Sequence, residues 1–194
     1  MVLSVALFAG QPGAAADRVS IVSAYLCTLL FCIALLIGPI TVITGGRLTL
    51  NQLLRRDLGI WTAVTGILHL ALGTELSMNV AYLETFVEGV VSPPAPAIRQ
   101  ALFTWSTIGG FIVGLLFLLL LALSNNAAIR LLGASWWKRL QRSSYLAFVL
   151  TAIHGFAFQI LESRSLIWIG VLAAIVTAVV AGQVAGVRAL KRTR

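Results

Sequence analysis

Five long apolar segments, separated by shorter polar stretches, dominate the hydropathy pattern of this chain. A helix needs about 20 residues to cross a hydrocarbon core of about 30 Å, and each segment reaches or approaches that length. A helix satisfies its backbone hydrogen bonds within its own segment. A single segment that crosses lipid must do so, because lipid offers no hydrogen-bond partners. The pattern therefore predicts an all-α integral membrane protein, a five-span helical bundle. The predicted spans cover about residues 19–44, 58–74, 101–123, 140–161 and 166–187.

Composition narrows the class of protein. The chain has 194 residues, of which 59% are hydrophobic and 10% are charged, whereas about a quarter of residues are charged in soluble proteins. A soluble catalytic domain is thereby excluded, and five spans leave no length for a flavin, nucleotide or DNA-binding domain. We expect an N-terminal outer segment (1–18), a five-helix transmembrane domain (19–187) and a basic cytoplasmic tail (188–194).

The charged residues of the predicted loops separate by side, within a formal net charge of +8. The first loop holds three arginines and one aspartate, and the third loop and the C-terminal tail hold four basic residues each. The second loop holds three glutamates and one arginine. Because basic loops stay in the cytoplasm, we expect a bacterial-type inner (plasma) membrane protein with its N-terminus outside and its C-terminus cytoplasmic. The charge reflects topology, and no nucleic acid is expected as a partner.

The chain has two histidines, His69 in the second predicted span and His154 in the fourth. Polar side chains inside a membrane are costly, so a functional role is the first hypothesis for both. His69 precedes Glu75 by six residues and His154 precedes Glu162 by eight, which corresponds to about 9 and 12 Å of helix. The two spans run in the same direction. Both imidazoles are therefore predicted at one depth, in the outer half of the membrane.

Two imidazoles at one depth on neighbouring helices match the two axial positions of a single haem iron, with the porphyrin held edge-on between spans 2 and 4. Two alternatives stay open. Each histidine could instead bind the magnesium of its own chlorophyll, or the two could have separate packing roles. A bare transition-metal site is a poorer fit, because neither span carries an acidic ligand nearby.

Small residues surround both histidines. Thr65, Gly66 and Gly73 lie on the helical face of His69, and Thr151 lies on the face of the second histidine. They would leave room for a flat macrocycle, and we interpret them as residues of the haem site. The other interpretation is simple helix packing, since small residues also mark helix contacts in lipid.

Three further features of the sequence each allow two interpretations. Arg99 and Arg164 lie near outer helix ends, where each could pair with a haem propionate or anchor at the interface. Small residues recur every four positions from Gly170 to Gly186, a stripe that could pack on the first span or dock another subunit. Residues 80–91 have helical apolar spacing and could form an amphipathic surface helix or an ordered loop.

Two stretches of the chain resemble the ferric reductase-like transmembrane domain family. The first is RRDLG at 55–59, which leads to GILH at 66–69; the second is SNN at 124–126 with RLLGASWWKRLQRSSY at 130–145, ending at His154. The resemblance covers about residues 55–159, over half of the chain. The family includes ferric-chelate reductases, the membrane core of NADPH oxidases and the haem-bearing membrane subunit of a bacterial methionine-sulfoxide reductase system.

The resemblance implies b-type haem between the second and fourth helices, with His69 and His154 at the outer-haem ligand positions. Family members with two stacked haems tend to carry a second histidine on each ligand helix. This chain has Arg55 and Gln141 at those positions, so one haem b is expected, near the outer face. A bis-histidine iron has no open coordination site, which favours electron transfer over oxygen activation at the metal.

These expectations point to a subunit rather than a self-sufficient reductase. Electrons are expected from membrane quinol, a redox protein or other membrane subunits, and are expected to pass to an outer-side acceptor. An alternative function is a non-redox assembly subunit or a (bacterio)chlorophyll-binding subunit of a membrane complex. A third hypothesis is a reductase that acts on an outer substrate through a partner.

Overall fold

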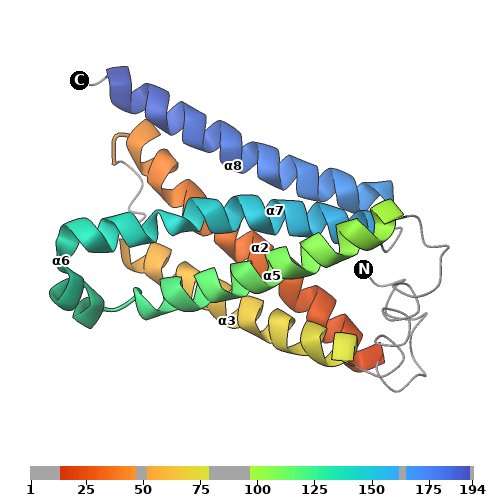
Figure 1. The fold of residues 1–194 in the computed structure, drawn as a ribbon. Coiled ribbons are helices and arrows are strands. Elements are labelled where there is room, and N and C mark those ends of the chain that lie inside the picture. The colour runs from red at the N-terminus through yellow and green to blue at the C-terminus, as the bar shows by residue number, and fades with distance from the viewer. Residues whose placement is uncertain (1–13, 47–51, 79–96, 162–164, 193–194) are drawn as a thin grey trace.

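The computed structural model describes residues 14–46, 52–78, 97–161 and 165–192 (Figure 1). These residues form six helices and no strand. The helices are α2 (Ala14–Ile43), α3 (Gln52–Met78), α5 (Ala97–Ala122), α6 (Asn126–Gln141), α7 (Ser143–Leu161) and α8 (Leu166–Arg192). The all-α prediction is confirmed for this part of the chain.

Four stretches of the described chain are long and apolar enough to cross a membrane. They are Arg18–Ile43 in α2, Ala101–Ala122 in α5, Asn126–Leu161 over α6 and α7, and Leu166–Arg192 in α8. The second predicted span forms α3, which is not among them. Its apolar segment, 58–74, is short, follows Arg55, Arg56 and Asp57, and contains His69. Membrane crossing by α3 therefore stays a prediction.

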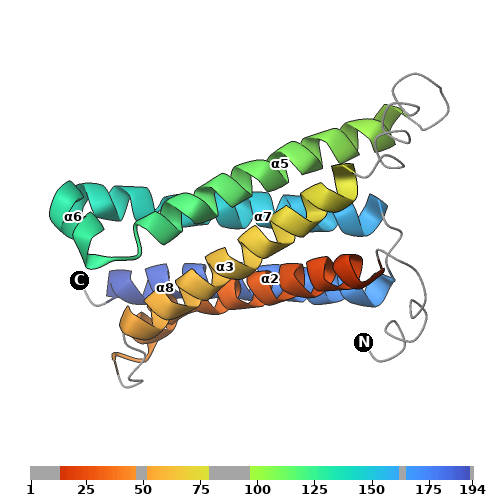
Figure 2. The ribbon, with the colours of Figure 1, turned by 90° about the horizontal axis from the view of Figure 1, so that it is seen from below.

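The five long helices form a closed ring of contacts, in which each packs against two neighbours. The contacting pairs are α2 with α3, α3 with α5, α5 with α7, α7 with α8, and α8 with α2. Figures 1 and 2 show these helices running lengthwise beside one another. Phe31 of α2 meets Phe117 edge-on, with ring centroids 5.2 Å apart, and Phe148 at 6.3 Å. Aromatic side chains from α2, α5 and α7 thus fill part of the ring.

Pro39 interrupts the hydrogen bonding inside α2. It has no N–H, so the carbonyl oxygen of Leu35, one turn earlier, loses its helical partner. Gln183 of α8 donates from Nε2 to this oxygen at 2.8 Å. Gly186 allows the close approach, because a Cβ there would lie 3.0 Å from the Cα of Pro39. This end of the small-residue stripe therefore packs on the first span, whereas Gly170 at the other end has open space around it.

A helix that the hydropathy pattern did not predict, α6, lies where α5 ends and α7 begins (Figure 1). We expected a loop there. Asn125 caps the helix, since its side chain accepts a hydrogen bond from the N–H of Ala128 at 2.8 Å. Gly133, at φ 73°, breaks the helix into two parts. None of its residues is buried, and its basic residues keep its average hydropathy too low to mark a span.

Basic residues gather at one end of the bundle. Figure 1 shows that the start of α3, all of α6 and the end of α8 share this end. The basic residues there are Arg55, Arg56, Arg130, Lys138, Arg139, Arg142, Arg188, Lys191 and Arg192. Asp57 is the only acidic residue among the described side chains of this end. The fold thus brings together the described basic residues of the two loops and the C-terminal tail that were predicted to share one side, although the orientation in a membrane stays a prediction.

The bond between Gln183 and Leu35 yields a prediction about stability. Gln183→Leu should destabilise the protein by about 1 kcal/mol, because the carbonyl oxygen of Leu35 then has no donor. In a Pro39→Ala background the restored N–H at residue 39 satisfies that oxygen, so the same substitution should cost clearly less. Thermal unfolding in detergent of the unsubstituted protein, the two single variants and the double variant measures the loss of stability in each background. Equal losses in the two backgrounds would contradict this account.

Candidate functional site

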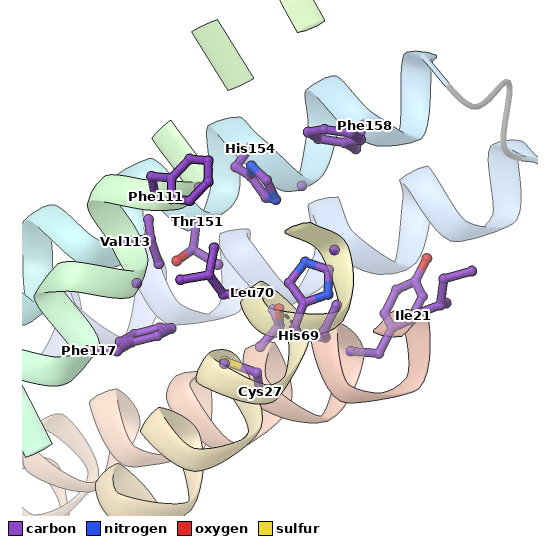
Figure 3. Close-up of a pocket in the computed structure, with 18 of the residues that line it drawn as sticks. Ile21, Cys27, His69, Leu70, Phe111, Val113, Phe117, Thr151, His154 and Phe158 are labelled. Carbon is purple, nitrogen blue, oxygen red and sulfur yellow. Dashed lines mark hydrogen bonds between the residues drawn. The ribbon is translucent and has the colours of Figure 1, made fainter. Parts of the chain in front are cut away.

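A cavity of about 360 Å³ lies inside the helix ring (Figure 3). Side chains from α2, α3, α5 and α7 line it, with Leu172 added from α8. Most of the lining is apolar, and both histidines belong to it. A largely apolar cavity with a few converging polar groups is the usual form of a cofactor site.

His69 and His154 lie together in this cavity. Their ring centroids are 6.2 Å apart and the ring planes are inclined at 75°. Figure 3 shows the two rings extending from separate helices towards the same space. Phe158, one turn after His154, packs on that ring with centroids 4.8 Å apart. The structure thus brings the two predicted residues together, while their depth in a membrane and their role as ligands stay predictions.

The backbone of α2 orients the ring of His69. Its Nδ1 lies 2.9 Å from the carbonyl oxygen of Ser20 and 3.1 Å from the hydroxyl of the same residue. A carbonyl oxygen can only accept a hydrogen bond, so Nδ1 carries the proton. In the neutral ring Nε2 then holds the lone pair that a metal ion requires.

The backbone of α5 orients His154 in the same way. Its Nδ1 lies 2.8 Å from the carbonyl oxygen of Ser106, so it too is the protonated nitrogen. Gly110, one turn further along α5, provides the space: a Cβ there would lie 2.7 Å from Cε1 of His154. Histidines that bind metals almost always donate their other ring N–H in this manner.

The predicted small residues divide into two groups. Gly66, Gly73 and Thr151 line the cavity. Thr65 does not line it; its hydroxyl donates to the carbonyl oxygens of Trp61 at 2.8 Å and Thr62 at 3.1 Å.

Two of the cavity glycines differ in what surrounds them. At Gly66 the space of a missing Cβ is filled, because Phe117 lies 2.6 Å from that position and the sulfur of Cys27 lies 3.0 Å away. At Gly73 nothing lies within 4 Å. Gly66 therefore admits side chains of the protein itself, whereas Gly73 leaves open space beside His69.

Three residues that line the cavity also carry a buried polar atom without a hydrogen-bond partner among the described residues. The atoms are the hydroxyl oxygens of Thr107 and Thr151 and the amide oxygen of Gln159. An unpaired buried polar group costs about 1–3 kcal/mol. Only Thr151 was among the predicted site residues.

Sequence reasoning missed the groups that orient the histidines. Ser20 and Ser106 act through carbonyl oxygens, which every residue has, so their residue types give no signal. Gly110 had a detectable signal, since Gly109 and Gly110 form an adjacent glycine pair in the middle of a span.

Two predicted residues and one predicted segment cannot be placed. Arg164 and residues 80–91 lie outside the described part of the chain. Arg99 lies in the first turn of α5, and its side chain is also outside the described part. Their predicted roles stay predictions.

The described residues contain no group of three or more histidine, cysteine, aspartate or glutamate residues that could hold a metal ion. Cys27 lines the cavity as a free thiol and donates to the carbonyl oxygen of Thr62 at 3.3 Å. Two imidazoles are therefore the available nitrogen donors, and they suit a metal whose other ligands come from a macrocycle.

The hydrogen bonds predict the tautomer of both histidines. Nitrogen-15 NMR of histidine-labelled protein, prepared without added cofactor, should show two neutral rings protonated at Nδ1. Ser20→Ala should leave the His69 tautomer unchanged, because the carbonyl oxygen, which this substitution keeps, is the acceptor. A ring protonated at Nε2 in the unsubstituted protein would refute the assignment.

Comparison with known proteins does not assign the chain to a family. No protein-family model, no curated protein and no solved structure matches the chain. The resemblance to the ferric reductase-like family therefore stays a prediction from the sequence. The functional argument depends on the cavity and on the two histidines that share it.

Proposed function

We propose that this protein is a b-type membrane cytochrome that holds one haem between α3 and α7, with His69 and His154 as axial ligands. It would relay electrons in the outer half of the membrane as a subunit of a larger complex. The observation that carries the proposal is the histidine pair, in which each Nδ1 is bonded to a backbone carbonyl oxygen.

The separation of the two rings fits one shared ion. Metal–imidazole bonds of about 2.0–2.1 Å place the centroids of two rings on opposite sides of an ion roughly 6–6.5 Å apart. The centroids of His69 and His154 are 6.2 Å apart. This spacing is therefore compatible with a single ion held by both imidazoles.

The residues of the chain have separate tasks in this proposal. The carbonyl oxygens of Ser20 and Ser106 keep both Nδ1 atoms protonated and both rings oriented. The apolar lining excludes water and lowers the local dielectric. Haem, when bound, supplies one-electron chemistry. If His69 and His154 both bound the iron, no coordination position would be left for a substrate, which would favour electron transfer.

The electron donor and acceptor belong to other molecules in this proposal. Quinol in the membrane, a redox protein or neighbouring membrane subunits would supply the electrons, and an outer-side acceptor would take them. The family resemblance supports this assignment.

At the inner end of α3, the Arg55 guanidinium reaches within 4.0 Å of the Cβ position of Gly38 on α2, and a cation there offers no ligand for a second haem.

The histidine ligands yield the central prediction. The purified protein should show the sharp reduced-minus-oxidised α-band of low-spin haem b, and His69→Ala or His154→Ala should remove it. Cys32→Ala, a buried site outside the cavity, is the control and should keep the band. If the band persists in both histidine variants, the two histidines are not the haem ligands. Solvent extraction that yields chlorophyll or no pigment would favour the alternative function.

Substitutions at two neighbouring glycines distinguish an effect on the position of the His154 ring from a general loss of stability. Gly110→Ala should lower haem affinity about tenfold, because the added methyl group displaces the His154 ring from Ser106. Gly109→Ala adds the same methyl group one residue earlier, where nothing lies within 4 Å, and should bind haem normally. Haem titration followed by absorbance compares the two variants, and equal affinities would remove the role given to Gly110.

A further inference from the structure

A groove of about 670 Å³ lies on the surface of α8, at the basic end of the bundle. Ile43, at the end of α2, forms part of its wall. Val180 and Val184 lie one turn apart along it and are about half exposed. Ala181 and Ala185 lie beside them, and their small side chains leave the groove hollow. The groove is thus an apolar channel along a helix that is apolar enough to cross a membrane.

The length of the groove matches one leaflet of a bilayer. From Val176 to Arg188 the helix advances twelve residues, which corresponds to about 18 Å. Half of a hydrocarbon core of about 30 Å is roughly 15 Å. A single acyl chain running from the middle of the membrane to the surface would therefore follow the groove along most of its length.

Two arginines line the groove at its C-terminal end. Arg188 and Arg192 are four residues apart, line the same groove and are exposed. No acidic residue occurs in α8, and Asp57 is the only acid among the described side chains at this end of the bundle. Two guanidinium groups one turn apart are suited to a phosphate, which accepts charge-assisted and bidentate hydrogen bonds.

We propose that this groove binds a phospholipid with an anionic head group, its acyl chain along the valines and its phosphate between Arg188 and Arg192. A second copy of the chain fits less well, because parallel packing of α8 on α8 would bring four arginines together. The site does not depend on the proposed haem, which lies inside the ring of helices.

Binding of two lipids with identical acyl chains tests the head-group preference. Native mass spectrometry of the full chain in detergent should show phosphatidylglycerol bound about tenfold more tightly than phosphatidylcholine. Arg188→Gln/Arg192→Gln should reduce the affinity for phosphatidylglycerol to that for phosphatidylcholine. Ala185→Leu, which fills the groove, should weaken the binding of both lipids.

A charge-matched control separates this site from general attraction to a basic surface. Arg139→Gln/Lys191→Gln removes two positive charges from the same end of the bundle, and neither residue lines the groove. This variant should keep the preference for phosphatidylglycerol. An equal loss in both double variants, or no preference in the unsubstituted protein, would overturn the proposal. So would a stable dimer in light scattering that Arg188→Gln/Arg192→Gln strengthens, since that result would assign the groove to a second copy.

Discussion

The rest of the site depends on two hydrogen bonds from imidazole Nδ1 atoms to backbone carbonyl oxygens of neighbouring helices. One joins α3 to α2 and the other joins α7 to α5. Each acceptor lies inside a helix, and a carbonyl oxygen can accept more than one hydrogen bond; the oxygen of Ser20 also accepts from the Ser23 hydroxyl at 2.8 Å. The two imidazole bonds hold both rings in the same cavity with the same nitrogen protonated.

Much of this arrangement could be predicted because the chain is so apolar. Long apolar runs identified the helices α2, α5, α7 and α8, and the two histidines stood out for their rarity. Counting residues to the nearest acidic residue was enough to match their depth. The same reasoning could not find Ser20 or Ser106, whose contribution is a main-chain oxygen. Nor could it find that Phe117 fills the space beside Gly66, because that contact depends on how α3 and α5 cross.

Two helices show the limits of average hydropathy. α6 packs no residue into the core, and the cap of Asn125 marks where it begins. α3 has the opposite character. Its Thr62 and Thr65 are buried, whereas Trp61, Val64 and Leu68 are exposed. These two polar residues face the ring and these three apolar residues face outwards, a sidedness that an average over the helix conceals.

The cavity that His69 and His154 share has a thermodynamic consequence for the whole bundle. Its walls come from α2, α3, α5 and α7 and exist only when the chain is folded, so a ligand that fills it binds the folded state and not the unfolded one. By mass action, folding and occupancy are then linked. A bound ligand would thus raise the unfolding temperature of all the helices that line the cavity.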